Sequence, residues 1–493
     1  MKRSDENVSD NRNGKNLQKQ NKSNNYLNET FLIIKKLGLQ ILSNLILRRT
    51  IKIALICICF LLMISFLFLL NRTKSPISDV FTTGRISILK DRPANITRDI
   101  IIDMSALPGP HSIVNLTSAL ISGIAKKRPN WRLSVLVPKE AKCLYNSKNP
   151  NVKLIEITRF PLTFFLIKRF FGIKSFGVFQ DKLTQLLFYD LIFCDSKCDL
   201  IWDPIGYDAF CNFINPTRIS TIHDIVHFDA HPPYVEISSF VLRSKICMRN
   251  TIRFSKKIIT VSEFSKSRIC DKFCVDQDFV KFIPIKLSTR IYSDDNPEKV
   301  SIVMKKYGLS SEKYFIFCSG WWPNKNHGNL IKAFNKFAQQ NSEIKLILVG
   351  KHYDKFESRP IEEFCSDRLI ITGFVPDEEL GILLKNALAF VHPSVYEGFG
   401  MPIIEAMANG IPVACSNVAS LPEVAGPAAL LFDPFNVDSI TQAMHRLADD
   451  PLLRKDLIQK GYDQAKKYSD REAMVDEYIR VMEEVMRKND HPS

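Results

Sequence analysis

Short apolar runs alternate with longer amphipathic stretches from Asp99 onward. In the first half this pattern predicts strands at Ile100–Met104, Leu133–Val137, Lys153–Ile157, Leu200–Asp203, Ile219–His223 and Lys257–Val261. Helices are predicted at His111–Lys127 and Val235–Phe254, and Ser262 is predicted to cap a further helix. The alternation is typical of α/β proteins in which helices cover both faces of a parallel sheet.

The same alternation begins again near Tyr314. Strands are predicted at Tyr314–Ser319, Lys345–Val349, Leu369–Ile371, Leu388–Val391 and Pro412–Cys415. We therefore expect two Rossmann-like domains, residues 99–287 and 313–469, joined by a polar linker at 288–312 that contains Pro297. A charged helix at Asp470–Lys488, followed by a tail, ends the chain at 493. Ligands of such sheets bind beyond the carboxyl ends of the strands, so a cleft between the two sheets is the predicted site.

The first hundred residues have a different character. Residues 1–50 form a polar tail that is rich in Asn and Lys up to Asn28, and we expect it to be disordered. Ile53–Leu70 holds 18 residues without a charge, which predicts a single transmembrane anchor at 51–70 and a linker at 71–98. Residues 31–47 fit an interfacial helix or a second hydrophobic insertion. The basic residues flanking the span are nearly balanced, so the side of the membrane that holds the domains stays open.

Charge and cysteine content narrow the classes of partner. The chain has 67 Lys and Arg against 52 Asp and Glu, a formal net charge of +15. This excess favours an anionic partner: a phosphate-rich substrate, an anionic membrane surface or nucleic acid. No nucleic-acid-binding motif is present, so nucleic acid is not an expected partner. The twelve cysteines do not have the density of a disulfide framework, and we expect most to be reduced and structural.

The most informative segment runs from the predicted strand at Ala387–His392 to Gly410. Glu397 and Glu405 flank a glycine turn, and Pro402 follows where a helix is expected to begin. The turn and the helix start, at Gly398, Phe399, Gly400 and Met401, allow close backbone approach and present helix amides to an anion. A diphosphate is the natural occupant. Glu405, about one turn into the helix, can accept hydrogen bonds from ribose hydroxyls, and Glu397 lies near the group attached to the far phosphate.

The spacing of Glu397 and Glu405 resembles the E-x7-E motif of retaining glycosyltransferases of family 4. Further similarity to the C-terminal domain of that family lies in Ser319–Asn326, Leu346–Gly350, Ile371–Pro376 and Ser420–Gly426. The resemblance covers roughly residue 100 to the C-terminus and is strongest from Tyr314 to Pro434. It implies the GT-B fold, two Rossmann-like domains that face a cleft, with the C-terminal helix crossing back onto the first domain.

The resemblance also implies an activity: a hexosyl group moves from a nucleotide-diphosphate sugar to a hydroxyl acceptor, a growing glycan or a lipid-linked one, with retention of configuration. No metal or other cofactor is implied. Lys325 matches a donor-phosphate lysine, and Glu397 matches the residue that binds or orients the donor sugar. The family often has an arginine near that lysine, whereas Trp321, Trp322, Pro323 and Asn324 occupy this turn here. Either another cation substitutes for the missing arginine, for which His327 is a candidate, or phosphate binding is weaker.

Two further segments carry candidate residues in the first domain. His223, followed by Asp224, matches a family His-Asp pattern after a strand, which implies contact with the transferring sugar or the acceptor and suggests a mannosyl donor. His223, His227 and His231 recur every four residues, but the prolines after them make a helical metal site doubtful, so no metal is predicted. Gly109 and His111 stand where the family often has a glycine-rich acceptor loop, which is glycine-poor here.

A basic and aromatic stretch at Arg159–Gln180 includes Lys168 and Arg169 and has no acidic residue. It fits a membrane surface, which would favour a lipid-linked acceptor, and equally a core-facing helix with a solvated basic face.

Two rival functions remain open on this sequence. One is a nucleotide-sugar epimerase with the same fold. The other is a non-catalytic, membrane-tethered protein that binds nucleotide sugars. The anchor speaks against the first, and the presence of Lys325 and both glutamates speaks against the second.

Overall fold

A computed structural model divides the chain into two compact units, Met1–Ile88 and Leu89–Ser493. It describes residues from 93 to 490, with gaps at 105–110, 139–148, 158–197, 207–216, 231–232, 236–238, 287–295, 310–312, 342 and 352–366. The predicted tail (1–50), interfacial helix (31–47), membrane anchor (51–70) and most of the linker (71–98) lie outside the described residues. Among the helices that are described, none has the length and apolar character to cross a bilayer.

The first sheet has seven parallel strands in the order β3-β2-β1-β4-β5-β6-β7. Their bounds are β1 Arg98–Asp103, β2 Trp131–Pro138, β3 Val152–Ile157, β4 Leu200–Asp203, β5 Arg218–Ile222, β6 Lys257–Thr260 and β7 Val280–Phe282. All six predicted strands are present, with ends within two residues of those expected. β7 was not predicted, because a three-residue strand is too short to show a hydrophobic period.

Helices connect these strands. Their bounds are α3 His111–Lys127, α6 Val226–Asp229, α7 Ser239–Phe254 and α8 Glu263–Phe273, with a 3₁₀ turn at Gln277–Phe279. The Ser262 hydroxyl accepts a hydrogen bond from the Ser265 amide at 3.0 Å, so the predicted N-cap of α8 is confirmed. The prediction that a helix begins at Val235 was wrong, since the chain still turns at 233–235 and α7 begins at Ser239.

The second sheet has six parallel strands in the order β10-β9-β8-β11-β12-β13. Their bounds are β8 Tyr314–Cys318, β9 Lys345–Val349, β10 Leu369–Gly373, β11 Ala389–His392, β12 Val413–Ser416 and β13 Ala429–Phe432. The five predicted strands are confirmed, whereas β13, which is only partly buried, was missed. Strand order reverses between β8 and β11, and this reversal is the topological switch point of the sheet.

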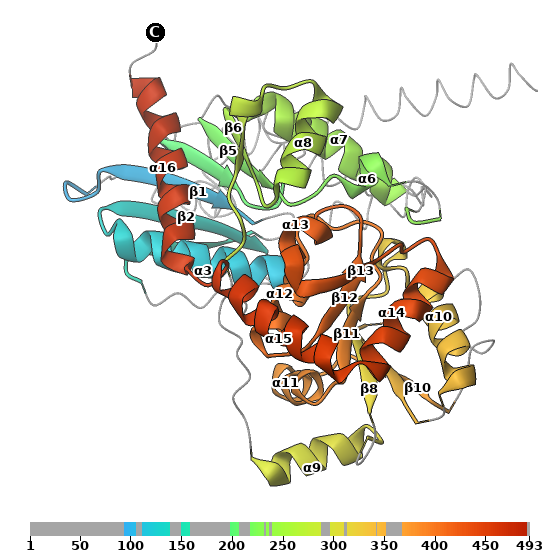
Figure 1. The fold of residues 1–493 in the computed structure, drawn as a ribbon. Coiled ribbons are helices and arrows are strands. Elements are labelled where there is room, and N and C mark those ends of the chain that lie inside the picture. Colours follow the sequence, from blue (N-terminus) through green and yellow to red (C-terminus); the bar gives the residue numbers. More distant parts are fainter. Residues whose placement is uncertain are drawn as a thin grey trace, which may run out of the picture. The chain divides into compact units, whose positions relative to one another are not determined.

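Helices lie on both faces of the second sheet (Figure 1). Their bounds are α10 His327–Gln340, α11 Asp377–Lys385, α12 Met401–Ala408, α13 Leu421–Ala425, α14 Val437–Asp449 and α15 Pro451–Lys466, with 3₁₀ turns η3 Pro323–Lys325 and η5 Gly426–Ala428. Figure 1 shows α10 and α14 on one face and α11, α12 and α15 on the other. α12 begins and ends as the sequence predicts, because Pro402 lies in its first turn and Gly410 follows its end with φ +72°.

The predicted linker at 288–312 is not wholly linker, because it contains the ten-residue helix α9, Pro297–Lys306. The Asn296 side chain accepts a hydrogen bond from the Glu298 amide, and Pro297 suits the first helical turn. The prediction took Pro297 as a sign of irregular chain. Its place directly after Asn296 is instead a helix-start signal.

The last helix, α16, Arg471–Asp490, packs against α3 of the first domain, as the resemblance implies. Lys127 donates to Asp476 at 2.7 Å, and the Arg128 guanidinium donates to Glu483 at 2.8 and 2.9 Å. At Gly123 of α3 an added Cβ would lie 2.6 Å from the Val475 side chain. The two helices are therefore in close contact, which ties the C-terminus to the first domain.

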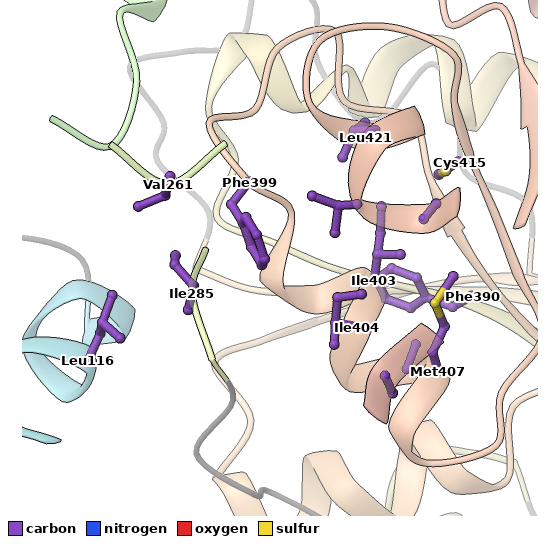
Figure 2. Close-up of a cluster of buried hydrophobic side chains, with 14 of the residues drawn as sticks. Leu116, Val261, Ile285, Phe390, Phe399, Ile403, Ile404, Met407, Cys415 and Leu421 are labelled. Carbon is purple, nitrogen blue, oxygen red and sulfur yellow. The ribbon is translucent and has the colours of Figure 1, made fainter. Parts of the chain in front are cut away.

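Apolar side chains from both sheets share one buried cluster. Figure 2 shows Phe399 with Val261 and Ile285 on one side of its ring and Ile403 and Ile404 of α12 on the other. Phe399 is 6% exposed. It therefore anchors the turn before α12 in the core, rather than presenting its ring to a ligand.

Candidate functional site

Lys325 and Glu397 meet at the switch point of the second sheet. Lys325 ends η3, in the loop that follows β8, and Glu397 lies in the loop that follows β11. These strands are neighbours, so their carboxyl ends place the two loops together. The Lys325 ammonium donates to Glu397 Oε1 at 2.6 Å. Two residues predicted separately from sequence, one for phosphate and one for sugar, thus form a single charged pair.

The Glu397 carboxylate has a second donor. His392, the last residue of β11, places Nε2 3.2 Å from the same oxygen, Oε1. Burial raises the pKa of Glu397, but the Lys325 charge and the hydrogen bond from His392 oppose it and hold the pKa well below its usual range. Burial lowers the pKa of His392. The site therefore contains an ionised carboxylate, a lysine cation and a neutral imidazole.

Backbone and side-chain hydrogen bonds fix the two loops against each other. The Asn324 side chain donates to the Tyr396 carbonyl at 2.9 Å, and the Val395 amide donates to the Asn324 carbonyl at 2.9 Å. Asn326 has φ +58°, and its side chain donates to the carbonyls of Pro393 and Pro434. The loop before Glu397 is therefore built on the loop that carries Lys325.

Ser420 holds the glycine turn in shape. Its hydroxyl lies 2.9 Å from each of the carbonyl oxygens of Glu397 and Phe399. Gly400 has φ +108°, a conformation that other residues rarely adopt, and it caps α12. These features fix the short turn that leads from Glu397 into the N-terminus of α12, the positive end of the helix dipole.

Glu405 lies one turn into α12 and is partly buried. After burial, the Glu405 charge is the cause that raises the pKa of the Cys318 thiol at the end of β8. This influence places Glu405 near the carboxyl end of β8, the strand that leads into the loop with Lys325. The predicted donor-binding residues of α12 and of the β8 loop therefore gather at one edge of the sheet.

His327 does not replace the missing arginine. It is 6% exposed, its ring stacks on Trp321 at 4.2 Å, and it also lies 5.0 Å from the ring of Phe317. The suggestion that it supplies a second cation is therefore wrong, because its ring belongs to the core beneath η3. Trp322, at the start of η3, is the exposed aromatic residue of this turn, at 40%.

His223 lies directly after β5, against the glycine turn of the second sheet. Its Nε2 is 3.0 Å from the Pro204 carbonyl, which can only accept, so Nε2 carries a proton. Burial lowers the pKa of His223, which keeps the ring neutral. At Gly398 an added Cβ would lie 2.0 Å from the His223 carbonyl oxygen. The predicted His and the predicted turn are therefore in direct backbone contact.

Helix α8 of the first domain also holds this turn. The hydroxyls of Ser262 and Ser265 donate to the Gly398 carbonyl at 2.6 and 3.2 Å. Glu423 of α13 accepts hydrogen bonds from the Glu263 and Phe264 amides at 2.9 and 3.0 Å, which caps α8 from the other sheet. These contacts join the glycine turn before α12 to the first domain.

A second connection runs through the residue before Glu397. The Tyr396 hydroxyl donates to Asp229 at 3.2 Å, and Arg268 donates to both oxygens of that carboxylate at 2.7 and 3.0 Å. Sequence reasoning missed this network and the role of His392, and it predicted Ser262 only as a helix N-cap and not as a contact of Gly398. Among the supporting residues, Ser420 and Glu423 had an indirect signal, since they belong to the segment Ser420–Gly426 already marked by its resemblance.

Several predicted residues cannot be placed at the site. Gly109, Lys168, Arg169 and the whole basic-aromatic stretch at Arg159–Gln180 lie outside the described residues. His111 begins α3, and its side chain is not described. Across the residues whose positions are described, no group of three or more His, Cys, Asp or Glu side chains could hold a metal ion. The absence of a metal requirement stays a prediction.

Comparison with known proteins identifies relatives of this chain. The family model for glycosyl transferases group 1 matches residues 301–464. The O-antigen chain mannosyltransferase B of Escherichia coli is 33% identical over 267 residues, which cover 52% of this chain and 69% of that protein. The MMP alpha-(1->4)-mannosyltransferase of Mycolicibacterium hassiacum is 30% identical over 199 residues, 40% of this chain and 46% of that protein.

Solved structures share the fold. Anabaena HepE, in a complex with UDP and glucose, matches with a TM-score of 0.57 and 18% identity over 79% of this chain and all of that chain. Together with the two parallel sheets, this likeness shows the GT-B fold.

Proposed function

The chain belongs to the glycosyl transferases of group 1, and from this premise we propose that it moves a mannosyl group from a nucleotide-diphosphate sugar to a hydroxyl acceptor. The mannosyl specificity rests on the mannosyltransferases to which the chain is similar. The nucleotide donor rests on the geometry at the switch point and on the UDP bound by a protein of the same fold. A membrane anchor, an acceptor that is a growing glycan or lipid-linked, and retention of configuration complete the proposal.

The pairing of Lys325 with Glu397 beside α12 carries this proposal. An ammonium group has three donors, and Glu397 uses one of them, so Lys325 can also donate to a diphosphate. The N-terminus of α12 adds positive potential from the helix dipole. Negative charge that develops on the leaving nucleoside diphosphate would thus be stabilised by groups arranged before the reaction.

The other residues receive roles from their positions. Glu405 accepts hydrogen bonds from the ribose hydroxyls. Glu397, held ionised, accepts hydrogen bonds from hydroxyls of the donor sugar and orients it. The backbone of His223 lies against the same turn from the first domain, and we assign its side chain to the transferring sugar or the acceptor. No metal is needed in this scheme, because Lys325 and the helix amides meet the phosphate charge.

Thermal stabilisation of the full-length chain in detergent tests the donor assignment. A ligand at 100 times its dissociation constant adds about 2.7 kcal/mol of stability. GDP-mannose, UDP-glucose and the free diphosphates form the panel, and transfer to an acceptor is followed by product analysis. One sugar nucleotide should raise the unfolding temperature. Glu405→Ala should abolish the shift, whereas Glu378→Ala, at a carboxylate that is 80% exposed, should not.

The same experiment can refute the proposal. A folded protein that no sugar nucleotide stabilises would instead be a protein without a donor site. An epimerised sugar nucleotide that forms without any acceptor would show an epimerase. Donor affinity that Glu405→Ala leaves unchanged would remove the ribose role from Glu405.

A further inference from the structure

His392 is a buried histidine that the donor chemistry does not itself require. It is 1% exposed and ends β11, five residues before Glu397. Its ring lies edge-on to Phe317 at 5.3 Å and stacked against Phe390 at 5.8 Å. An apolar residue would fill such a pocket without the cost of burying a polar ring. Packing alone therefore does not explain a histidine here.

The two ring nitrogens of His392 differ in their surroundings. Nε2 lies 3.2 Å from Glu397 Oε1. Nδ1 is buried and has no hydrogen-bond partner within the described part of the chain. An ionised carboxylate can only accept, so Nε2 carries the proton and Nδ1 is a bare acceptor. The ring therefore leaves one polar atom unsatisfied and uses the other to hold the carboxylate.

We propose that His392 is a positioning residue for catalysis: its Nε2–H fixes the Glu397 carboxylate in the orientation that receives the donor sugar. The inference rests on the proposed function of Glu397. Lys325 contacts the same oxygen, but its flexible stem has to serve the donor phosphate as well. His392 has no such second role, and its packed ring cannot follow the phosphate. It thus keeps Oε1 in place while Lys325 engages the donor.

Two substitutions separate positioning from packing. His392→Phe keeps an aromatic ring in the pocket and removes the Nε2–H group that donates the hydrogen bond to Glu397. It loses a hydrogen bond to a charged group but also removes the unsatisfied Nδ1, so the unfolding temperature should change little. His392→Gln offers an amide N–H at about the position of Nε2 and should retain the contact. His445→Phe is the control, because His445 lies 4.8 Å from the Phe337 ring and 3.7 Å from Asp449 on α14, away from the site.

Steady-state kinetics of the full-length protein give the first readout. His392→Phe should lower kcat about tenfold to a hundredfold, the effect of losing one hydrogen bond to a charged group. KM for the donor should change much less, because Lys325, Glu405 and α12 hold the nucleotide. His392→Gln should restore most of the rate, and His445→Phe should not alter it. Wild-type kcat in His392→Phe, or equal losses in the Phe and Gln variants, would overturn the inference.

Nitrogen NMR of ¹⁵N-histidine-labelled protein gives a readout that does not depend on transfer. The signal that His392→Phe removes should show a protonated Nε2 and an unprotonated Nδ1, and it should shift in Glu397→Gln. A proton on Nδ1, or a signal whose chemical shift is unchanged in Glu397→Gln, would refute the contact between His392 and Glu397. If the wild type transfers no sugar while the NMR result holds, the proposed function fails and the His392–Glu397 contact stands.

Discussion

Replacing Lys325 with methionine should destabilise the protein, and the loss should depend on pH. Methionine keeps the unbranched stem of the side chain and removes the charge. Glu397 would then remain as a buried carboxylate whose only described side-chain donor is His392. Burial, which raises the pKa of Glu397, would no longer be opposed by the Lys325 charge. The folded state would therefore contain a carboxylate that prefers to be protonated.

The structure sets the size of the effect. Breaking a fully buried ion pair costs about 3–5 kcal/mol, whereas an exposed pair contributes about 0–1 kcal/mol. The Lys325 and Glu397 side chains are 20% and 13% exposed, near the buried limit. We expect a loss of about 2–3 kcal/mol near neutral pH, which lowers the unfolding temperature of a domain of this size by about 4–10 °C. Adding Glu397→Gln to Lys325→Met should recover part of the lost stability, because no buried charge is then left unpaired.

The sign of the pH dependence follows from linkage. In the wild type the lowered pKa of Glu397 contributes stability above the pKa of the unfolded chain, and this contribution is lost as pH falls through the folded pKa. In Lys325→Met the folded pKa moves upward, so the folded state takes up a proton first. The difference in unfolding free energy between the wild type and Lys325→Met should therefore shrink as pH falls from about 8 to about 5.

Scanning calorimetry or intrinsic fluorescence across this pH range checks the prediction. Lys336→Met is the matched control, because Lys336 donates to Asp438 at 2.7 Å while both side chains are more than half exposed. That variant should lose less than about 1 kcal/mol, at every pH. A Lys325→Met protein that is as stable as the control, or whose deficit is the same at pH 5 and pH 8, would refute the reasoning.

Two further substitutions test the contact between the sheets and the buried acid of β4. Gly398→Ala should lower kcat at least about tenfold, because its Cβ would lie 2.0 Å from the His223 carbonyl, whereas Gly328→Ala, with no atom within 4 Å of its Cβ, should be neutral in the same assay. Burial, then the charge of Asp103, raises the pKa of Asp203 to about 6 from 3.8, so stability should fall as pH rises through this window. Asp203→Asn should remove that slope in a pH series of melting curves; an unchanged slope would assign it to another group.

Much of the fold could be predicted because parallel strands buried on both faces leave a strong sequence signal. Nearly every residue of β1, β8 and β11 is buried, and these runs were located to within two residues. β7 was missed because it has three residues, and β13 was missed because it is half exposed. The predicted linker at 288–312 was too long because α9, inside it, is amphipathic over only ten residues and was not recognised as a helix.

The site could be predicted in its charged residues and not in its supports. Glu397 and Glu405 flank a glycine turn, and Lys325 follows a predicted strand. Both patterns can be recognised directly in the sequence. His392 ends an apolar strand, and nothing in the pattern shows that its ring turns back to a carboxylate five residues later. Asp229 meets Tyr396 across 167 residues, a distance at which no spacing rule applies.

The supports also show why the two sheets act together at this site. The Gly398 carbonyl receives Ser262 and Ser265, and the Gly398 Cα lies against the backbone of His223. Glu397 is the preceding residue, and its carboxylate is held by Lys325 and His392. Any movement of the first domain relative to this turn must strain either the Gly398 contacts or the carboxylate pair. The position of the first domain and the orientation of the Glu397 carboxylate are therefore mechanically coupled through one peptide unit.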